Sequence, residues 1–265
     1  MLAFDTVGRG EGPFVVLLHG WPLDRSIWRE VAPRVAEAGF RVLVPDLPGF
    51  GSRPPLPPAS STVEAFADEV AAFLEAHARG PTAVAGHSFG GYVALALAER
   101  DPDRVAGLGL IASRTFADSE AARRGRHEAI EKVRAQGTAA LLPGLAEKLL
   151  APTAPSGLRE RAAATVARAH PDAVVAGLAA MARRPDRTRV LEGFEGPVLV
   201  VHGAQDALIP ISEAPAPSGP HRTVRVLPGA GHMPMWESIG PTADAIVAWA
   251  SGLRSARRTS KGAAR

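Results

Sequence analysis

Residues 82–91 read TAVAGHSFGG, and this stretch decides the fold of the chain. Small and β-branched residues at its start predict a buried strand, and the apolar residues after it recur with the period of a helix. Between strand and helix lies Gly-x-Ser-x-Gly, the nucleophile-elbow pattern. Gly86 and Gly90 are required because side chains there would collide with neighbouring chain. The turn exposes the Ser88 hydroxyl at a helix N-terminus, where the helix dipole favours developing negative charge.

The alternation of strand and helix continues on both sides of this turn. Short β-branched runs, each followed by a loop and a helix-period stretch, lie at Phe14 to Leu18, Arg41 to Pro45, Thr82 to Ala85, Val105 to Ile111, Pro197 to Val201 and Thr223 to Leu227. Helices are expected at Ser26 to Ala38, Thr62 to Ala78, Gly90 to Arg100 and Pro241 to Leu253. The pattern predicts an α/β fold, a mostly parallel twisted sheet with helices on both faces. The strand Leu2 to Val7 and the glycine-rich turn after it predict an antiparallel hairpin at the start.

One long stretch, from about Thr115 to Val190, breaks this rhythm. It has no strand-like run and is rich in Ala, Arg, Leu and Glu. Helix patterns lie near Ser119 to Gln136, Thr138 to Leu150, Leu158 to Ala169 and Asp172 to Ala182. We expect a helical cap, or lid, at residues 115–190, inserted into a core domain formed by residues 1–114 and 191–253. Residues 254–265 are expected to be a basic, disordered tail.

Bulk composition excludes several classes of function. The chain has 265 residues, is 46% hydrophobic and carries a formal net charge of +3. Part of the positive excess lies at the C-terminus, in Arg254, Arg257, Arg258, Lys261 and Arg265. No basic stripe interleaved with aromatic residues indicates nucleic-acid binding. No apolar run is long enough to cross a bilayer, and no signal peptide opens the sequence. We expect a cytoplasmic protein, monomer or homodimer, that binds neither nucleic acid nor membranes.

Cysteine is absent, so covalent catalysis would need another nucleophile. A serine hydroxyl is weak until a base takes its proton, and the base must be oriented by a carboxylate. In this fold the expected order is serine, acid, histidine. Asp206 and His232 fit that order, and each follows the end of a predicted strand, where open α/β sheets place their ligand sites. Asp118 also follows a strand and is an alternative acid.

An oxyanion hole is the third requirement of such a site. One backbone N–H should come from Phe89, directly after the serine. The other should come from the loop HGWPLD at 19–24, where Trp21 is the candidate. In that loop we expect His19 to hold the backbone in place.

Five motifs spread along the chain carry a family resemblance: HGWP at 19–22, DLPGFGS at 46–52, GHSFGG at 86–91, GAQD at 203–206 and GAGH at 229–232. Together they resemble the α/β-hydrolase superfamily, up to about Leu253. The resemblance implies the fold, a catalytic triad of Ser88, Asp206 and His232, and a lid. It argues against the haloalkane dehalogenase and epoxide hydrolase branches, which have an aspartate where this chain has Ser88. The sequence is most similar to small carboxylesterases and to the enol-lactonase group.

These observations predict a serine hydrolase that cleaves small-molecule carboxylic esters through an acyl-enzyme intermediate and needs neither a metal nor an organic cofactor. Two alternatives stay open. The same residues could open a lactone, or use peroxide in place of water, and Arg114, Arg123 and Arg124 could then pair with a substrate carboxylate. The chain could also be a non-catalytic protein that binds a ligand and signals to a partner.

Overall fold

The arrangement of the strands is taken from a computed structural model, which describes residues 2–9, 12–51, 53–57 and 59–262. Among these residues, seven strands form one sheet in the order β1-β3-β2-β4-β5-β6-β7. The strands are β1 (Phe4–Val7), β2 (Phe14–Leu18), β3 (Arg41–Pro45), β4 (Thr82–His87), β5 (Val105–Ile111), β6 (Val198–Gly203) and β7 (Arg222–Leu227). β1 is antiparallel to β3, and every other neighbouring pair is parallel. The predicted α/β fold is confirmed.

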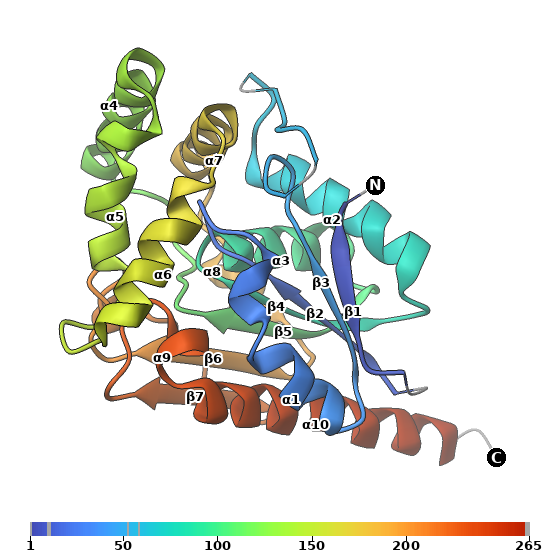
Figure 1. Cartoon of the computed structure of the whole chain (residues 1–265). Coiled ribbons are helices and arrows are strands. Elements are labelled where there is room, and N and C mark those ends of the chain that lie inside the picture. The colour runs from blue at the N-terminus through green and yellow to red at the C-terminus, as the bar shows by residue number, and fades with distance from the viewer. Residues whose placement is uncertain (1, 10–11, 52, 58, 263–265) are drawn as a thin grey trace.

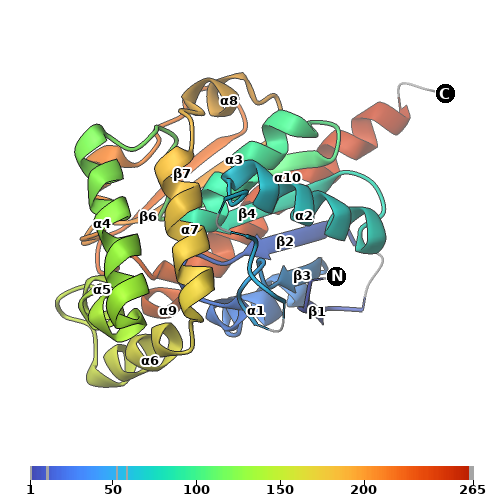
Figure 2. The same ribbon diagram turned by 90° about the horizontal axis from the view of Figure 1, so that it is seen from above.

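Helices cover both faces of the sheet (Figures 1 and 2). α1 (Val31–Glu37) and α10 (Ile239–Gly262) pack together on one face, and α2 (Val63–His77) and α3 (Phe89–Arg100) lie on the other. α2 begins where the sequence predicts: Thr62 is its N-cap, and its hydroxyl accepts a hydrogen bond from Ala65 N–H at 3.1 Å. The helices α1 and α10 thus enclose the sheet from one side, and α2 and α3 from the other.

The predicted hairpin at the start of the chain is wrong. β1 pairs with β3, with Phe4 opposite Pro45, and β2 is not its neighbour. β2 lies between β3 and β4 and is hydrogen-bonded to both, so neither of its edges is free. The antiparallel strand therefore occupies the outer edge of β3, which a hairpin with β2 would not allow.

Between β5 and β6 the chain forms helices: α4 (Glu120–Gln136), α5 (Leu142–Lys148), α6 (Ser156–Ala167), α7 (Pro171–Arg183) and α8 (Thr188–Gly193). We call residues 115–190 the cap segment. The single helix expected at 138–150 is divided into the 3-10 helix η2 (Thr138–Ala140) and α5, whose first turn contains a proline. α7 is buried from Ala173 to Ala182 and packs against both α4 and α2. It is the inner helix of the segment (Figure 2).

The last helix is longer than the sequence led us to expect. α10 continues to Gly262, so the backbone of residues 254–262 is helical where we expected disorder, and residues 263–265 lie outside the described residues. No glycine or proline interrupts the chain between Leu253 and Gly262, and arginine and alanine favour helix. None of the helices in the described part of the chain is both long and apolar enough to span a membrane.

Candidate active site

Ser88 occupies the sharp turn that joins β4 to α3. Its backbone has φ 49° and ψ −112°, a conformation that a residue with a side chain rarely adopts. Its N–H donates to Ile111 C=O at 2.8 Å, and its C=O accepts from the Ser113 hydroxyl at 2.8 Å. A Cβ at Gly86 would lie 2.1 Å from the carbonyl carbon of Gly90. The turn therefore requires glycine and is held by hydrogen bonds from β5 and its end.

Asp206 and His232 are brought together from the ends of β6 and β7. His232 Nδ1 lies 2.7 Å from Asp206 Oδ2, and both side chains are buried. Asp206 Oδ1 also accepts the backbone N–H groups of Leu208 at 2.8 Å and Ile209 at 2.9 Å. Burial alone would raise the pKa of the Asp206 carboxyl, but His232 and the two amides together hold the pKa below its ordinary value. The carboxylate thus stays ionised beside the imidazole and orients it.

Asp118, the alternative acid, lies elsewhere and has other partners. Its buried carboxylate forms ion pairs with Arg114 at 2.9 Å and Arg184 at 2.8 Å, and also with Arg126. Burial acts to raise its pKa, but Arg126 and Arg184 lower it below the ordinary value. No contact with His232 is found among its described partners, so the geometry favours Asp206 as the partner of the histidine.

The arginines considered for a substrate carboxylate are engaged or exposed. Arg114 pairs with Asp118 and with Glu213, and Arg124 pairs with Glu120 at 2.8 Å. Arg123 is exposed on α4. The structure therefore gives no specific support to the idea that these three side chains bind a carboxylate of the substrate.

The two proposed oxyanion donors follow neighbouring strands. Trp21 comes after β2 and Phe89 after β4, and Leu18 of β2 is paired with Gly86 of β4. Phe89 is the first residue of α3, so its N–H has no acceptor within the helix. In the part of the chain that the structure describes, neither amide donates to a backbone carbonyl. No described backbone carbonyl therefore competes with a ligand oxygen for either amide.

Two side chains fix the loop that carries Trp21. His19 Nδ1 donates to Gly20 C=O at 3.0 Å, and its Nε2 accepts Leu47 N–H at 2.9 Å, so this histidine holds the backbone. The Trp21 indole N–H donates to Val174 C=O on α7 at 3.1 Å. The loop is thereby attached to the core at one end and to the cap segment at the other.

His87 has a contact that the sequence did not indicate. Its Nε2 donates to the carbonyl of His232 at 2.8 Å. Burial, and then the nearby His232, lower the pKa of His87 well below the ordinary value, so its ring stays neutral. The two residues are 145 positions apart, so no local sequence pattern indicates this contact.

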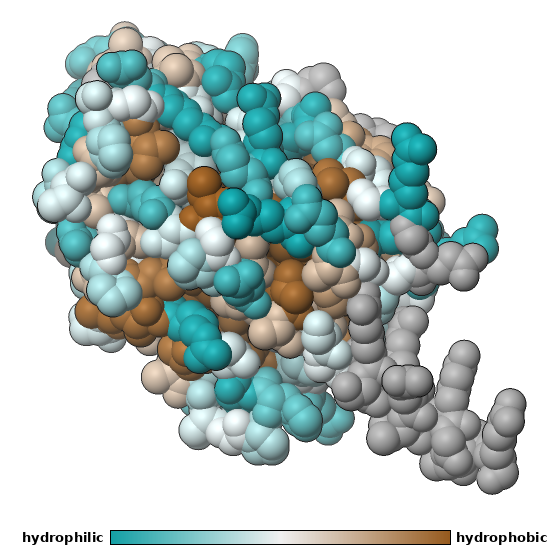
Figure 3. All heavy atoms as spheres, turned by 60° about the horizontal axis from the view of Figure 1, so that its bottom comes forward, coloured by the Kyte–Doolittle hydropathy of each residue, from teal (hydrophilic) through white to brown (hydrophobic). Residues whose placement is uncertain are grey.

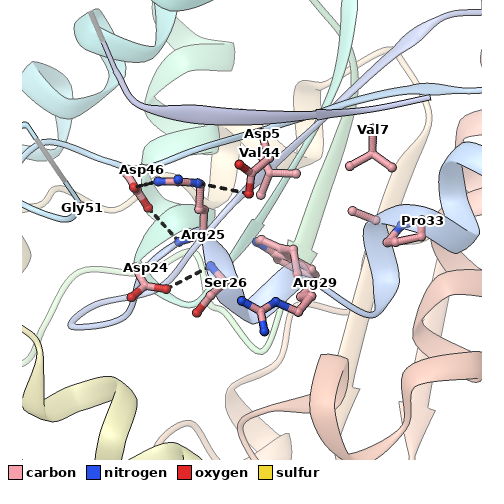
Figure 4. A pocket seen from close by; sticks show the side chains of 12 residues that line it. Asp5, Val7, Asp24, Arg25, Ser26, Arg29, Pro33, Val44, Asp46 and Gly51 are labelled. Carbon is pink, nitrogen blue, oxygen red and sulfur yellow. Dashed lines mark hydrogen bonds and ion pairs between the residues drawn. The ribbon is translucent and has the colours of Figure 1, made fainter. Parts of the chain in front are cut away.

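A cavity of about 470 Å³ lies apart from these residues. It is lined by β1, β3 and the 3-10 helix η1 (Arg25–Trp28). Figure 4 shows Arg25 between Asp5 and Asp46, with an ion pair to each. Ser88, Asp206 and His232 are not among its described lining residues, so this cavity is not the candidate site.

Comparison with known proteins shows which family this chain resembles. A family model described as the alpha/beta hydrolase fold matches residues 13–239. The pimeloyl-[acyl-carrier protein] methyl ester esterase of Chromobacterium violaceum is 32% identical over 235 residues, which cover 85% of this chain and 89% of that protein.

Solved structures agree with this match. A thermophilic esterase from Thermogutta terrifontis, bound to malate, is 34% identical with a TM-score of 0.89, over 95% of this chain and 93% of that one. The enol-lactonase from Burkholderia xenovorans LB400 is 21% identical with a TM-score of 0.82, over 94% of this chain and 96% of that one, and shows the fold alone. The resemblance to esterases is confirmed, and the resemblance to the enol-lactonase group is confirmed for the fold.

Proposed function

This chain belongs to the α/β-hydrolase fold family, and from that premise we propose that it is a serine esterase that cleaves carboxylic esters through an acyl-enzyme intermediate. The observation that carries the proposal is the buried Asp206–His232 pair, 2.7 Å apart. It is linked to the elbow because His87, next to Ser88, hydrogen-bonds the His232 carbonyl. A carboxylate, an imidazole that it orients and a serine in a sharp strand-to-helix turn are the parts that this chemistry requires.

The proposal assigns one role to each residue. His232 Nε2 takes the proton of the Ser88 hydroxyl, and the serine oxygen attacks the ester carbonyl. The negative oxygen that forms is stabilised by the backbone N–H groups of Phe89 and Trp21. His232 then protonates the leaving alcohol. In the second half, His232 takes a proton from water, the water oxygen attacks the acyl carbonyl, and His232 returns the proton to the Ser88 oxygen as the acid leaves. Asp206 stabilises the imidazolium throughout.

A small-molecule carboxylic ester is the substrate class that this proposal names. The relative from Chromobacterium violaceum bears the name of a methyl ester esterase, so methyl esters of dicarboxylic acids are candidates alongside simple acyl esters. A separate lactonase assignment gains no support, because Arg114 is already paired with Asp118 and Glu213.

Replacement of the nucleophile tests the proposal. We expect Ser88→Ala to lower kcat on p-nitrophenyl butyrate by at least about 10³-fold, because the acyl-enzyme cannot form. Labelling by a fluorophosphonate should be lost in the same variant. Ser212→Ala, an exposed serine in the 3-10 helix η3 (Ile211–Glu213), is the matched control and should retain both. Equal turnover by wild type and Ser88→Ala would refute the assignment.

A further inference from the structure

One carboxylate beside the site is used by none of the steps above. Glu237 is the last residue of α9 (Pro234–Glu237), five positions after His232. Its Oε2 accepts the N–H of Gly231 at 2.9 Å and the N–H of Met233 at 3.3 Å. These are the two backbone amides that flank His232. Its Oε1 accepts the N–H of Ala151 at 2.7 Å.

The third of these amides belongs to the cap segment. Ala151 follows α5, and it is buried against the loop that carries His232. A Cβ at Gly231 would lie 2.4 Å from Ala151 N and 2.7 Å from the carbonyl carbon of Leu150. The cap segment and the His232 loop are therefore in direct backbone contact, and Glu237 joins the two.

The opposite side of the same backbone is held by His87. Its Nε2 donates to the His232 carbonyl at 2.8 Å, while Glu237 binds the amides on either side. Asp206 fixes the ring through Nδ1. With the main chain and Nδ1 both held, the direction in which Nε2 points is determined.

Burial of the Glu237 carboxyl opposes its ionisation, and the three amides favour it. Burial, with a smaller contribution from Asp206, raises the pKa of Glu237 above its ordinary value even though the amides of Ala151, Gly231 and Met233 oppose the rise. A raised pKa means that keeping this carboxyl ionised at neutral pH lowers the free energy of unfolding.

We propose that Glu237 is a positioning residue that fixes the backbone on both sides of His232 and couples it to the cap segment at Ala151. The proposal rests on the assigned roles of Ser88 and His232. Glu237 does not touch the substrate. It acts through His232, and its carboxyl group is needed because three N–H donors converge on two oxygens, which the amide of glutamine cannot satisfy.

The test compares Glu237→Gln with wild type on p-nitrophenyl butyrate at pH 7.5. Glutamine keeps the volume but turns an NH₂ group toward at least one of the three N–H donors. We expect kcat to fall about 10-fold to 100-fold, as displacement of a catalytic group by a fraction of an ångström to one ångström does. KM should change less than about two-fold, because the substrate contacts are unchanged. The rate of labelling by a fluorophosphonate should fall in parallel.

Glu30→Gln is the matched control. Glu30 is also a partly buried glutamate that joins the core to the cap segment, through an ion pair with Arg161 at 2.8 Å, but it makes no contact with residues 231–233 among its described partners. Its kcat should stay at the wild-type value. Melting temperatures of both variants show whether each is folded at the assay temperature.

Three outcomes would overturn the proposal: wild-type kcat in Glu237→Gln, an equal loss of kcat in Glu30→Gln, or a loss that only follows the unfolded fraction. Ser88→Ala separates this result from the assignment of function. If Ser88→Ala is inactive and Glu237→Gln behaves as wild type, the esterase mechanism stands and the positioning role fails. If Ser88→Ala is active, the proposed function itself fails.

Discussion

At the residue scale, the Asp206–His232 contact leads to a clear prediction for Asp206→Asn. The amide preserves shape but can no longer stabilise a protonated imidazole, and it favours the wrong ring tautomer. We expect kcat to fall about 10³-fold to 10⁴-fold, measured with p-nitrophenyl butyrate, while KM changes little.

Asp118→Asn is the control for this variant, because Asp118 was the rival acid. It should keep kcat within a few-fold of wild type but reduce the free energy of unfolding, since Arg114, Arg126 and Arg184 lose a shared buried partner. The opposite pattern, an inactive Asp118→Asn and an active Asp206→Asn, would exchange the two assignments.

The sequence predicts the candidate site only as far as local patterns allow. Ser88, Asp206 and His232 can be found because each follows a strand, and the fold brings the carboxyl ends of parallel strands to one edge. His87 and Glu237 act on backbone groups that lie far away in the sequence or on a loop whose shape is not known in advance. His87 reaches His232, 145 positions on, and Glu237 reaches Ala151, 86 positions back. No composition or spacing rule points to such contacts.

At the scale of elements, the contact between α7 and the Trp21 loop gives the next prediction. A Cβ at Gly177 would lie 2.2 Å from Trp21 Cδ1 and 2.8 Å from its Nε1. Gly177→Ala should therefore displace the indole, break its hydrogen bond to Val174 and move the Trp21 amide proposed as an oxyanion donor. We expect kcat to fall about ten-fold.

Gly125→Ala in α4 is the matched control, because nothing lies within 4 Å of the added Cβ. It should raise the free energy of unfolding by about 0.5–1 kcal/mol, as replacement of a helical glycine does, with no change in kcat. Unchanged kcat in Gly177→Ala would show that the indole contact does not position the donor.

Elements were predicted best where periodicity and caps agree. α2 and α4 begin at the N-caps Thr62 and Ser119, whose hydroxyls accept hydrogen bonds from the first turn. The position of β1 depends instead on which sheet edge is free. Because β2 pairs with both β3 and β4, it has no open edge for β1, which pairs with the outer edge of β3. Strand order is a property of the assembled sheet, so a pattern along the chain cannot give it.

At the scale of the whole molecule, ion pairs join the cap segment to the core on two sides. Arg168 of the cap segment pairs with Asp24 at 2.6 Å, and Arg187 pairs with Glu99 at 2.9 Å. Arg187 is buried, so its pairing is less screened than a surface contact. On the face drawn in Figure 3, hydrophilic side chains lie between several hydrophobic areas.

Buried neutral histidines predict how the stability of the molecule depends on pH. Burial lowers the pKa of His19 below its ordinary 6.5, against opposing effects of Asp46 and Gly20, and burial together with His232 lowers that of His87 well below it. The unfolded chain therefore binds protons that the folded chain does not, once the pH is below about 6.5. The stabilising contribution of these two groups is complete above that pH and is lost as the pH falls toward the folded-state values.

Urea denaturation between pH 7.5 and 5.5 measures this loss. We expect the free energy of unfolding to decrease on acidification with a slope of up to about 1.4 kcal/mol per pH unit for each histidine. Carboxylates with a lowered pKa, such as Asp206, lose their contribution to the free energy of unfolding only at lower pH. The raised pKa of Glu237 has the opposite effect, so its contribution increases on acidification. His87→Gln keeps a donor for the His232 carbonyl but cannot titrate, so its slope should be smaller than that of wild type. A free energy of unfolding that is constant over this range would mean that both rings can be protonated in the folded protein.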